Sequence, residues 1–177
     1  MEGRLDMPKE SILTRMASIG DIGQITEIYN QGIVDRIATL ESNTKSVEEM
    51  RTWFNIRSER HKVLVAEDGE GNIIGWASLN VFNVRECYRG VSDLSIYIRR
   101  EERGKGLGKR LLIALIEIAK QTGFHKLVLS TFSFNFAGQR LYTSVGFTKV
   151  GTYVKQGIVD GKWIDMTIME KLLIDNL

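Results

Sequence analysis

Residues 93–110 read DLSIYIRREERGKGLGKR, and this stretch constrains the fold of the chain more than any other. A short apolar strand runs into a basic, glycine-rich turn, which opens an amphipathic helix with apolar residues at helical spacing. The glycines let the backbone approach a ligand closely, and the free N–H groups and positive dipole of a helix N-terminus favour an anion. The stretch therefore predicts a site for the phosphates of a cofactor, held by Arg103, Gly104, Lys105, Gly106, Leu107, Gly108 and Lys109.

Two other phosphate-binding motifs do not fit this stretch. The P-loop spacing fails, and Lys109 is followed by Arg110 in place of Ser or Thr. The dinucleotide fingerprint GxGxxG fails because the glycines are spaced by two residues, and no acidic residue ends a following strand. The pattern that remains is RxxGxG, at Arg103, Gly106 and Gly108. A surface turn with solvated charges is the alternative interpretation.

Length and charge add broader limits. The 177 residues suit one domain with a real core, and we expect a flexible leader at residues 1–11 and a single domain at 12–177. The net charge is only +2, and the basic excess is confined to residues 99–110. A nucleic-acid partner would need a wider basic face, so none is expected.

Cysteine and histidine are scarce. One cysteine excludes a disulfide within the chain, and two separated histidines give no metal-ligand spacing, so no metal cofactor is expected. The N-terminus carries no apolar signal segment, and no run of about 18 apolar residues occurs anywhere. We therefore expect a cytoplasmic protein without a membrane partner.

Hydrophobic periodicity and turn residues predict the order β-α-α-β-β-β-α-β-α-β-β. Capping boxes begin the first two helices, at residues 18–21 and 46–49, and Asn135 caps the last helix. Strands are expected at residues 12–16, 62–67, 73–82, 90–98, 126–130, 147–154 and 163–171. This order is typical of an α/β sandwich built around a mixed sheet.

The element order and the RxxGxG loop together resemble the GNAT superfamily of N-acetyltransferases, over nearly the whole chain. Further segments resemble its phosphinothricin and methionine-derivative branch: IYN at 28–30, IATLE at 37–41, SVEEMRTWF at 46–54, FxxRxxY at 82–88 and GKWIDM at 161–166. Leu40 is a departure, because the branch commonly has Phe there. The resemblance implies an α/β fold with a mixed, mostly antiparallel central sheet flanked by helices.

The same resemblance implies the reaction. An acetyl group would pass from acetyl-CoA to the α-amine of a small amino-acid-like acceptor, by direct attack in a ternary complex. Phosphinothricin, methionine sulfone and methionine sulfoximine are the acceptors that the branch suggests, and the branch tends to form homodimers. Two alternatives keep the fold: an acceptor that is a protein N-terminus, a polyamine or an aminoglycoside, or a non-catalytic sensor that binds acyl-CoA.

Two residues stand at positions that the family uses for catalysis. Asp93 occupies the place of a glutamate general base, which the reaction needs because an α-amino group with a pKa of about 8 must attack as the neutral amine. An acid at a strand-end turn is the alternative. Tyr142, in LYTSVGF, matches a tyrosine that protonates the leaving thiolate in many of these enzymes, although this branch often has His or Phe. A core aromatic is the alternative for Tyr142.

The resemblance also implies contacts with the two substrates. The pantetheine arm of the coenzyme would lie along the strand, at Leu94, Ile96 and Ile98, and touch Asn135 beyond its role as a helix cap. A substrate loop would contain Phe82, Arg85 and Tyr88. A guanidinium matches a carboxylate in bidentate geometry, so Arg85 would receive the acceptor's carboxylate. A solvated loop arginine is the alternative for Arg85.

Overall fold

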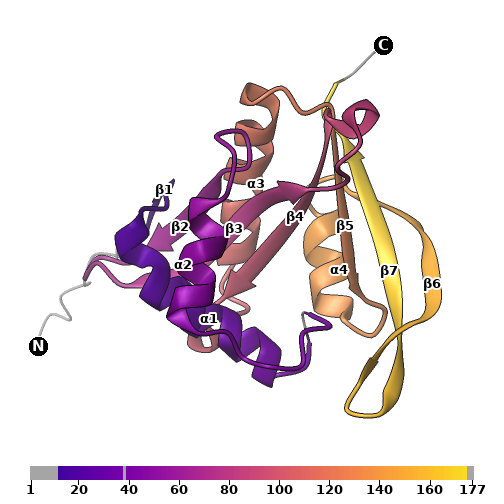
Figure 1. Ribbon diagram of the computed structural model, residues 1–177, viewed down its shortest axis with the longest axis horizontal. Helices are drawn as coiled ribbons and strands as arrows, with labels where there is room; N and C mark the ends of the chain where they lie inside the picture. The colour runs from indigo at the N-terminus through magenta and orange to yellow at the C-terminus, as the bar shows by residue number, and fades with distance from the viewer. Residues whose placement is uncertain (1–11, 38, 175–177) are drawn as a thin grey trace, which may run out of the picture.

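The computed structural model describes residues 12–37 and 39–174, shown as a ribbon in Figure 1. The expected leader at residues 1–11 lies outside the described residues, so it stays a prediction. Within the described part, seven strands are formed: β1 Leu13–Met16, β2 Val63–Glu67, β3 Ile73–Val81, β4 Val91–Ile98, β5 Lys126–Phe132, β6 Thr148–Val159 and β7 Lys162–Leu172. The α-helices of this part are α1 Ile22–Val34, α2 Val47–Asn55, α3 Leu107–Gln121 and α4 Phe136–Thr143. The predicted order of elements is confirmed.

The strands form one sheet in the order β1-β2-β3-β4-β5-β7-β6. Every neighbouring pair is antiparallel except β4 and β5, which confirms the mixed, mostly antiparallel sheet. The parallel pair is short, because only residues 91–93 of β4 pair with residues 126–128 of β5. Beyond Asp93 the two strands part, and residues 94–98 have a strand partner only on the β3 side. The backbone of β4 is thereby left open along half its length.

Helices cover both faces of the sheet (Figure 1). On one face, the apolar side of α3 packs with Leu94 of β4 and with Tyr142 of α4. On the other face, α1 and α2 pack over β2 and β3, around Trp76 and with Tyr97 beside it. Successive side chains of β4 therefore point to different cores, as strand alternation requires. The open half of β4 lies between these two packed layers.

The last hairpin is longer than the sequence patterns indicate. The expected sixth strand ended at Val154, but β6 continues to Val159. The register shifts between Tyr153 and Gly157, and the strand then resumes its pairing with β7 up to a turn at residues 160–161. At the irregularity, Lys155 has a φ of 51° and donates its N–H to Asp165 Oδ1 at 2.7 Å. A bulge breaks the local alternation without ending the strand, which is why periodicity alone stopped too early.

Candidate active site

The predicted phosphate loop joins the end of β4 to the start of α3. Gly104 and Gly106 have φ values of 78° and 86°, in the left-handed region that glycine reaches without strain. The first N–H group of α3 that has a backbone acceptor is that of Arg110, which donates to Gly106 O at 3.3 Å. The backbone N–H groups of residues 104–109 have no acceptor within the described part of the chain. Six free donors at the positive end of a helix form a site suited to an anion.

Gly108 has a different role from the two glycines before it. A Cβ atom at Gly108 would lie 2.9 Å from Leu141 Cδ2, so the absence of a side chain lets α3 approach α4. The neighbouring Leu107 is buried in the core and faces the loop only with its backbone. Gly108 and Leu107 thus secure the position of the loop, while its conformation comes from Gly104 and Gly106.

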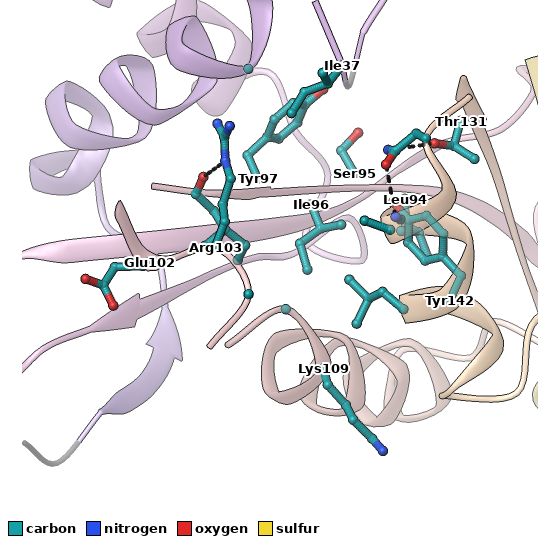
Figure 2. Close-up of a pocket in the computed structure, with 18 of the residues that line it drawn as sticks. Ile37, Leu94, Ser95, Ile96, Tyr97, Glu102, Arg103, Lys109, Thr131 and Tyr142 are labelled. Atoms are coloured by element: carbon teal, nitrogen blue, oxygen red, sulfur yellow. Dashed lines mark hydrogen bonds between the residues drawn. The ribbon is translucent and has the colours of Figure 1, made fainter. Parts of the chain in front are cut away.

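The basic side chains of the loop are directed mainly elsewhere. Arg103 donates from Nε to Ile98 O at 3.0 Å and forms an ion pair with Asp35 at 2.5 Å, and Figure 2 shows its guanidinium turned away from Lys109. Lys105 pairs with Glu102 at 3.0 Å, and the side chain of Lys109 points outward from the helix in Figure 2. Arg103 therefore ties the loop to β4 and α1, and the backbone carries most of the attraction for an anion.

A cavity of about 350 Å³ runs from this loop along the open half of β4 to α4 (Figure 2). We call it the β4 cavity. Its wall includes nine of the eleven residues expected to bind the cofactor: Leu94, Ile96, Ile98, Arg103, Gly104, Gly106, Gly108, Lys109 and Asn135. Lys105 and Leu107 are not part of the wall. The structure thus brings the loop, the strand and the start of α4 together around one elongated space.

Two polar side chains stand at the α4 end of the β4 cavity. Asn135 caps α4, because its Oδ1 accepts from the Gly138 N–H at 2.9 Å, and its Nδ2 donates to Thr131 Oγ1 at 3.2 Å. Tyr142 also lines the cavity, and its hydroxyl has no hydrogen-bond partner among the described residues. Burial, with a smaller contribution from the charge of Asp93, raises the pKa of Tyr142 above its ordinary value. Tyr142 is therefore a neutral hydroxyl that can donate a hydrogen bond.

A second cavity, of about 440 Å³, lies on the α1 and α2 side of β4. We call it the aromatic cleft; it is lined by Tyr29, Glu41, Lys45, Glu49, Met50, Trp53, Trp76, Ser78, Asn80, Asp93, Ser95 and Tyr97. Ser95 and Tyr97 line both cavities, so the two spaces meet at β4. Asp93 faces the aromatic cleft and Tyr142 faces the β4 cavity, which places an acid and a hydroxyl on the two sides of one junction.

Asp93 is chemically poised for proton transfer. Burial raises the pKa of its carboxyl from 3.8 to about 6, although hydrogen bonds from the Leu94 N–H and the Asn80 amide oppose this rise. A group whose pKa lies near the working pH is an effective general base, because it is ionised and still binds a proton readily. The turn-acid interpretation does not account for a carboxylate held in the wall of a cleft.

The cleft contains residues that the sequence patterns did not single out for binding. Trp76 stacks on Tyr97 with ring centres 4.9 Å apart, and Tyr29 meets Tyr97 edge-on at 4.9 Å. Trp53 and Trp76 form part of the wall. The Nε1 of Trp76 is buried without a hydrogen-bond partner among the described residues. The alternation of residues 76, 78 and 80 along one strand face was the signal available for this wall.

Charged groups also line the cleft. Lys45 Nζ pairs with Glu41 Oε2 at 2.9 Å, and Glu49 caps α2 by accepting from the Ser46 N–H at 2.7 Å. Among the described residues in the wall there are thus two carboxylates besides Asp93, and one ammonium group. Both an amine and a carboxylate of a ligand would find a partner of opposite charge here.

The expected substrate loop lies between β3 and β4. Phe82 and Tyr88 pack edge-on with ring centres 5.5 Å apart, and Arg85 begins a short 3₁₀ turn that Tyr88 closes. The loop is exposed, and Phe82, Arg85 and Tyr88 belong to the wall of neither cavity. The structure therefore groups these three residues with one another and not with Asp93. Their predicted role in binding stays a prediction.

Two features of other protein classes are missing from residues 12–37 and 39–174. No three His, Cys, Asp or Glu side chains there are grouped so that they could hold a metal ion. No helix of this part is both long enough and apolar enough to pass through a lipid bilayer.

Known proteins resemble this chain in sequence and in fold. The acetyltransferase (GNAT) domain model matches residues 15–168. The L-methionine sulfoximine/L-methionine sulfone acetyltransferase of Pseudomonas aeruginosa is 34% identical over 157 residues, which are 88% of this chain and 91% of that protein. The L-amino acid N-acyltransferase MnaT of Escherichia coli is 32% identical over the same shares of the two chains.

Solved structures agree with these sequence matches. The crystal structure of a GNAT superfamily phosphinothricin acetyltransferase from Sinorhizobium meliloti in complex with AcCoA has a TM-score of 0.87 and 31% identity. The match covers 91% of this chain and 88% of that one. Family model, sequence relatives and structure all span nearly the whole chain, and the predicted resemblance is confirmed. The chain belongs to the GNAT family of acetyltransferases.

Proposed function

We propose that this protein transfers an acetyl group from acetyl-CoA to the α-amine of a small amino-acid-like acceptor of the methionine sulfone, methionine sulfoximine or phosphinothricin type. One observation carries the proposal: the β4 cavity and the aromatic cleft meet at Ser95 and Tyr97, with Asp93 beside the junction. Two substrates that entered from the two sides of β4 would meet there without a covalent enzyme intermediate. The named activities of the relatives support the same reaction.

The residues of the β4 cavity fit acetyl-CoA. Six free N–H groups in residues 104–109 suit the pyrophosphate, and the unpaired edge of residues 94–98 offers backbone groups to the amides of a pantetheine arm. Asn135 and Tyr142 stand at the far end of the cavity, near the place where a thioester would lie. When bound, acetyl-CoA supplies the activated acetyl group, and backbone N–H groups of β4 polarise its carbonyl oxygen.

Two side chains at the junction carry out the two proton transfers, one as a base and the other as an acid. Asp93 accepts a proton from the acceptor's ammonium group, directly or through water, so that the neutral amine attacks. An aspartate is one methylene shorter than the glutamate that is usual here, which favours the route through water. The Tyr142 hydroxyl donates to the departing thiolate. Because the corresponding thiol has a pKa of about 8.5, the thiolate leaves with little assistance. The effect of Asp93 is therefore expected to be larger than that of Tyr142.

Substrate specificity provides the first test of this function. Thiol release from acetyl-CoA is measured with methionine sulfone, methionine sulfoximine, phosphinothricin, free amino acids, spermidine and a short peptide. We expect turnover only with acceptors that carry a free α-carboxylate, at least tenfold above spermidine, because a charge-assisted pair contributes about 1.5–3 kcal/mol. Turnover of spermidine or peptide alone would contradict the amino-acid acceptor, and tight coenzyme binding without any turnover would favour an acyl-CoA sensor.

Two cations compete for the acceptor's carboxylate, and single variants separate them. Arg85 is the group that the family resemblance implies, whereas Lys45 lies in the wall of the aromatic cleft itself. We expect Arg85→Ala to raise the acceptor KM at least tenfold with little change in kcat, as loss of a uniform binding contact does. Lys45→Ala is the matched variant. An increase in KM for Lys45→Ala alone would assign the carboxylate to the cleft lysine and leave Arg85 as a solvated loop residue.

A polyamine acceptor is the second candidate, and a specific observation favours it. Glu41 and Glu49 line the cleft beside Asp93, while Arg85, whose positive charge would repel a cationic ligand, lies outside it. Carboxylates and aromatic faces both attract an alkylammonium group. The spermidine arm of the acceptor series distinguishes this candidate from an amino acid.

We further propose that the protein acts in the cytoplasm as a homodimer that pairs through the β6–β7 hairpin. Its exposed apolar side chains include Tyr153, Val154 and Trp163, which are 56%, 70% and 60% exposed. Val154 and Trp163 line the same surface hollow, and exposed apolar surface of this kind is typical of interfaces. We expect light scattering to give twice the mass of the chain, and Trp163→Glu to give a monomer. Val84→Glu is the control, because Val84 is 94% exposed but lies in the β3–β4 loop; a monomeric wild type would contradict the proposal.

A further inference from the structure

Arg57 is a half-buried cation beside the aromatic cleft that the proposed mechanism does not use. It follows α2, and its Cζ lies 4.4 Å from the centre of the Trp53 ring. Its Nε donates to His61 O at 2.9 Å, and its Nη2 donates to Leu79 O. Burial lowers the pKa of the guanidinium to about 10, so the group stays charged at neutral pH. No carboxylate among the described residues pairs with it, so this charge requires another explanation.

The remaining partner of Arg57 is the side chain of Asn80. Arg57 Nη2 donates to Asn80 Oδ1 at 3.2 Å, and Ser78 Oγ donates to the same oxygen at 3.0 Å. On its other side, Asn80 Nδ2 donates to Ser95 Oγ at 3.0 Å. Asn80 lies directly opposite Asp93 in the β3–β4 ladder, and its nearby amide lowers the pKa of the Asp93 carboxyl. Asn80 therefore accepts from Arg57 and donates toward Asp93.

The orientation of this amide matters because the side-chain amide of an asparagine can flip by 180° and still occupy the same space. Its oxygen and its NH₂ group then exchange places, and the neighbours decide which arrangement is stable. Ser78 and Ser95 do not decide it, since a hydroxyl can donate or accept. Arg57 does, because a guanidinium only donates and so draws the Asn80 oxygen toward itself. In the other arrangement, the oxygen of Asn80 would face the carboxylate of Asp93 and repel it.

We propose that Arg57 is a positioning residue for acetyl transfer: it holds the Asn80 amide in the orientation that presents NH₂ to Asp93. The proposal rests on the proposed role of Asp93 as the base. Within the described structure, no hydrogen bond or ion pair joins Arg57 to Asp93 itself. The influence of Arg57 on the base therefore passes through Asn80.

Other titratable groups surround Asp93. They are Tyr29, Glu41, Lys45, Glu49 and Tyr97 in the aromatic cleft, and Tyr142 across β4. None of them hydrogen-bonds Arg57 or Asn80. His61 is different, because burial and then the charge of Arg57 lower its pKa, so a change at Arg57 also changes the titration of His61. All pH profiles are therefore measured in a His61→Gln background.

The test is the pH dependence of kcat/KM for acetyl transfer in Arg57→Met, Arg57→Lys, Asn80→Ala and the double variant Arg57→Met/Asn80→Ala. We expect Arg57→Met to lower kcat/KM by about tenfold to a hundredfold, the scale of a misplaced reacting group. The acid limb should move to higher pH, by about half a unit, because the amide that lowers the pKa of Asp93 is no longer held toward the ionised carboxylate. Arg57→Lys, which still only donates, should restore part of both effects. The double variant should be no worse than Asn80→Ala alone.

Arg60 provides a matched control. Its Cζ lies 4.3 Å from the centre of the Phe124 ring, and its guanidinium donates to the carbonyl oxygens of Thr122, Arg89 and Gly123. This is the same kind of structural anchor as Arg57, without a link to Asn80. Arg60→Met should lower stability and leave the acid limb where it is.

Distinct outcomes overturn the two proposals. A folded Arg57→Met variant with the wild-type acid limb, or additive effects of Arg57→Met and Asn80→Ala, would overturn the positioning role while the proposed function stands. If Arg57→Met does not fold, Asn80→Ala tests the positioning role instead. An Asn80→Ala variant with the wild-type acid limb would overturn it, because Arg57 would then have no route to Asp93. Full activity in Asp93→Asn would instead remove the base, and the proposed mechanism with it.

Discussion

Replacement of Asp93 by asparagine should lower kcat/KM for acetyl transfer by about a hundredfold to ten-thousandfold near pH 8, the usual contribution of a general base. The isosteric amide keeps the shape of the side chain but cannot take up the proton. In the wild type, activity should rise with pH through about 6, where the pKa of Asp93 lies, and then level off. The measurement is thiol release against pH for both proteins. Asp93→Glu is the control, and it should retain activity because a glutamate is usual at this position.

The same substitution should stabilise the fold. Since the pKa of Asp93 is about 6 in the folded protein and 3.8 ordinarily, the folded state holds a proton that the unfolded chain has released between those pH values. Wild-type stability therefore falls as pH rises through this window and stays lower above it. The difference corresponds to about 3 kcal/mol, which solvent in the cleft reduces, so we expect Asp93→Asn to gain about 1–2 kcal/mol at pH 8 in denaturant unfolding. An Asp93→Asn variant that is less stable and fully active would contradict both expectations.

Replacement of Gly106 by alanine should raise the KM for acetyl-CoA by about tenfold to a hundredfold, because hydrogen bonds to charged groups contribute about 1.5–3 kcal/mol each. Gly106 has a φ of 86°, where a side chain is strained by about 1–2 kcal/mol, and relaxing that strain would turn the free N–H groups out of alignment. The change should appear in the steady-state KM and in direct binding of the coenzyme, with kcat little affected at saturation.

Gly71 is the matched control for Gly106. It also has a φ of 86° and open space around the missing Cβ, but it lies in the turn between β2 and β3. Gly71→Ala should therefore lose a similar amount of stability and leave the KM for acetyl-CoA unchanged. Equal KM values for the two variants would show that residues 104–109 do not bind the coenzyme. Gly108→Ala should instead act on stability, because its Cβ would meet Leu141 at 2.9 Å.

Much of the fold could be predicted because its signals are local. The glycines at 104 and 106, the capping box at residues 46–49 and the Asn135 cap act within a few residues, and each lies where the sequence placed it. The exception, the end of β6, follows the same logic. The bulge at residues 153–157 interrupts the local pattern, and only the pairing with β7 shows that the strand continues.

The candidate site was only partly predictable, because its members come from distant segments. Asp93 could be found from the family resemblance and from its place on the strand that leads into the loop, but its neighbour Asn80 depends on the register of β3 against β4. The charge of Arg103 suggested a contact with phosphates, but the structure pairs Arg103 with Asp35, in the segment after α1, at 2.5 Å. The aromatic cleft needs rings from α1, α2, β3 and β4, each of which alone is consistent with an ordinary core residue.

The sequence by itself determined the order of elements, the phosphate loop and the family, since these depend on periodicity, caps and glycine conformations that neighbouring residues set. The tertiary structure alone decided how the two cavities meet at β4, why the pKa of Asp93 is raised, and which residues lie around its carboxyl. These properties arise from burial and from contacts between strands and helices far apart in the chain. Burial sets the electrostatic environment of a carboxylate, and no local pattern of residues determines what will cover it.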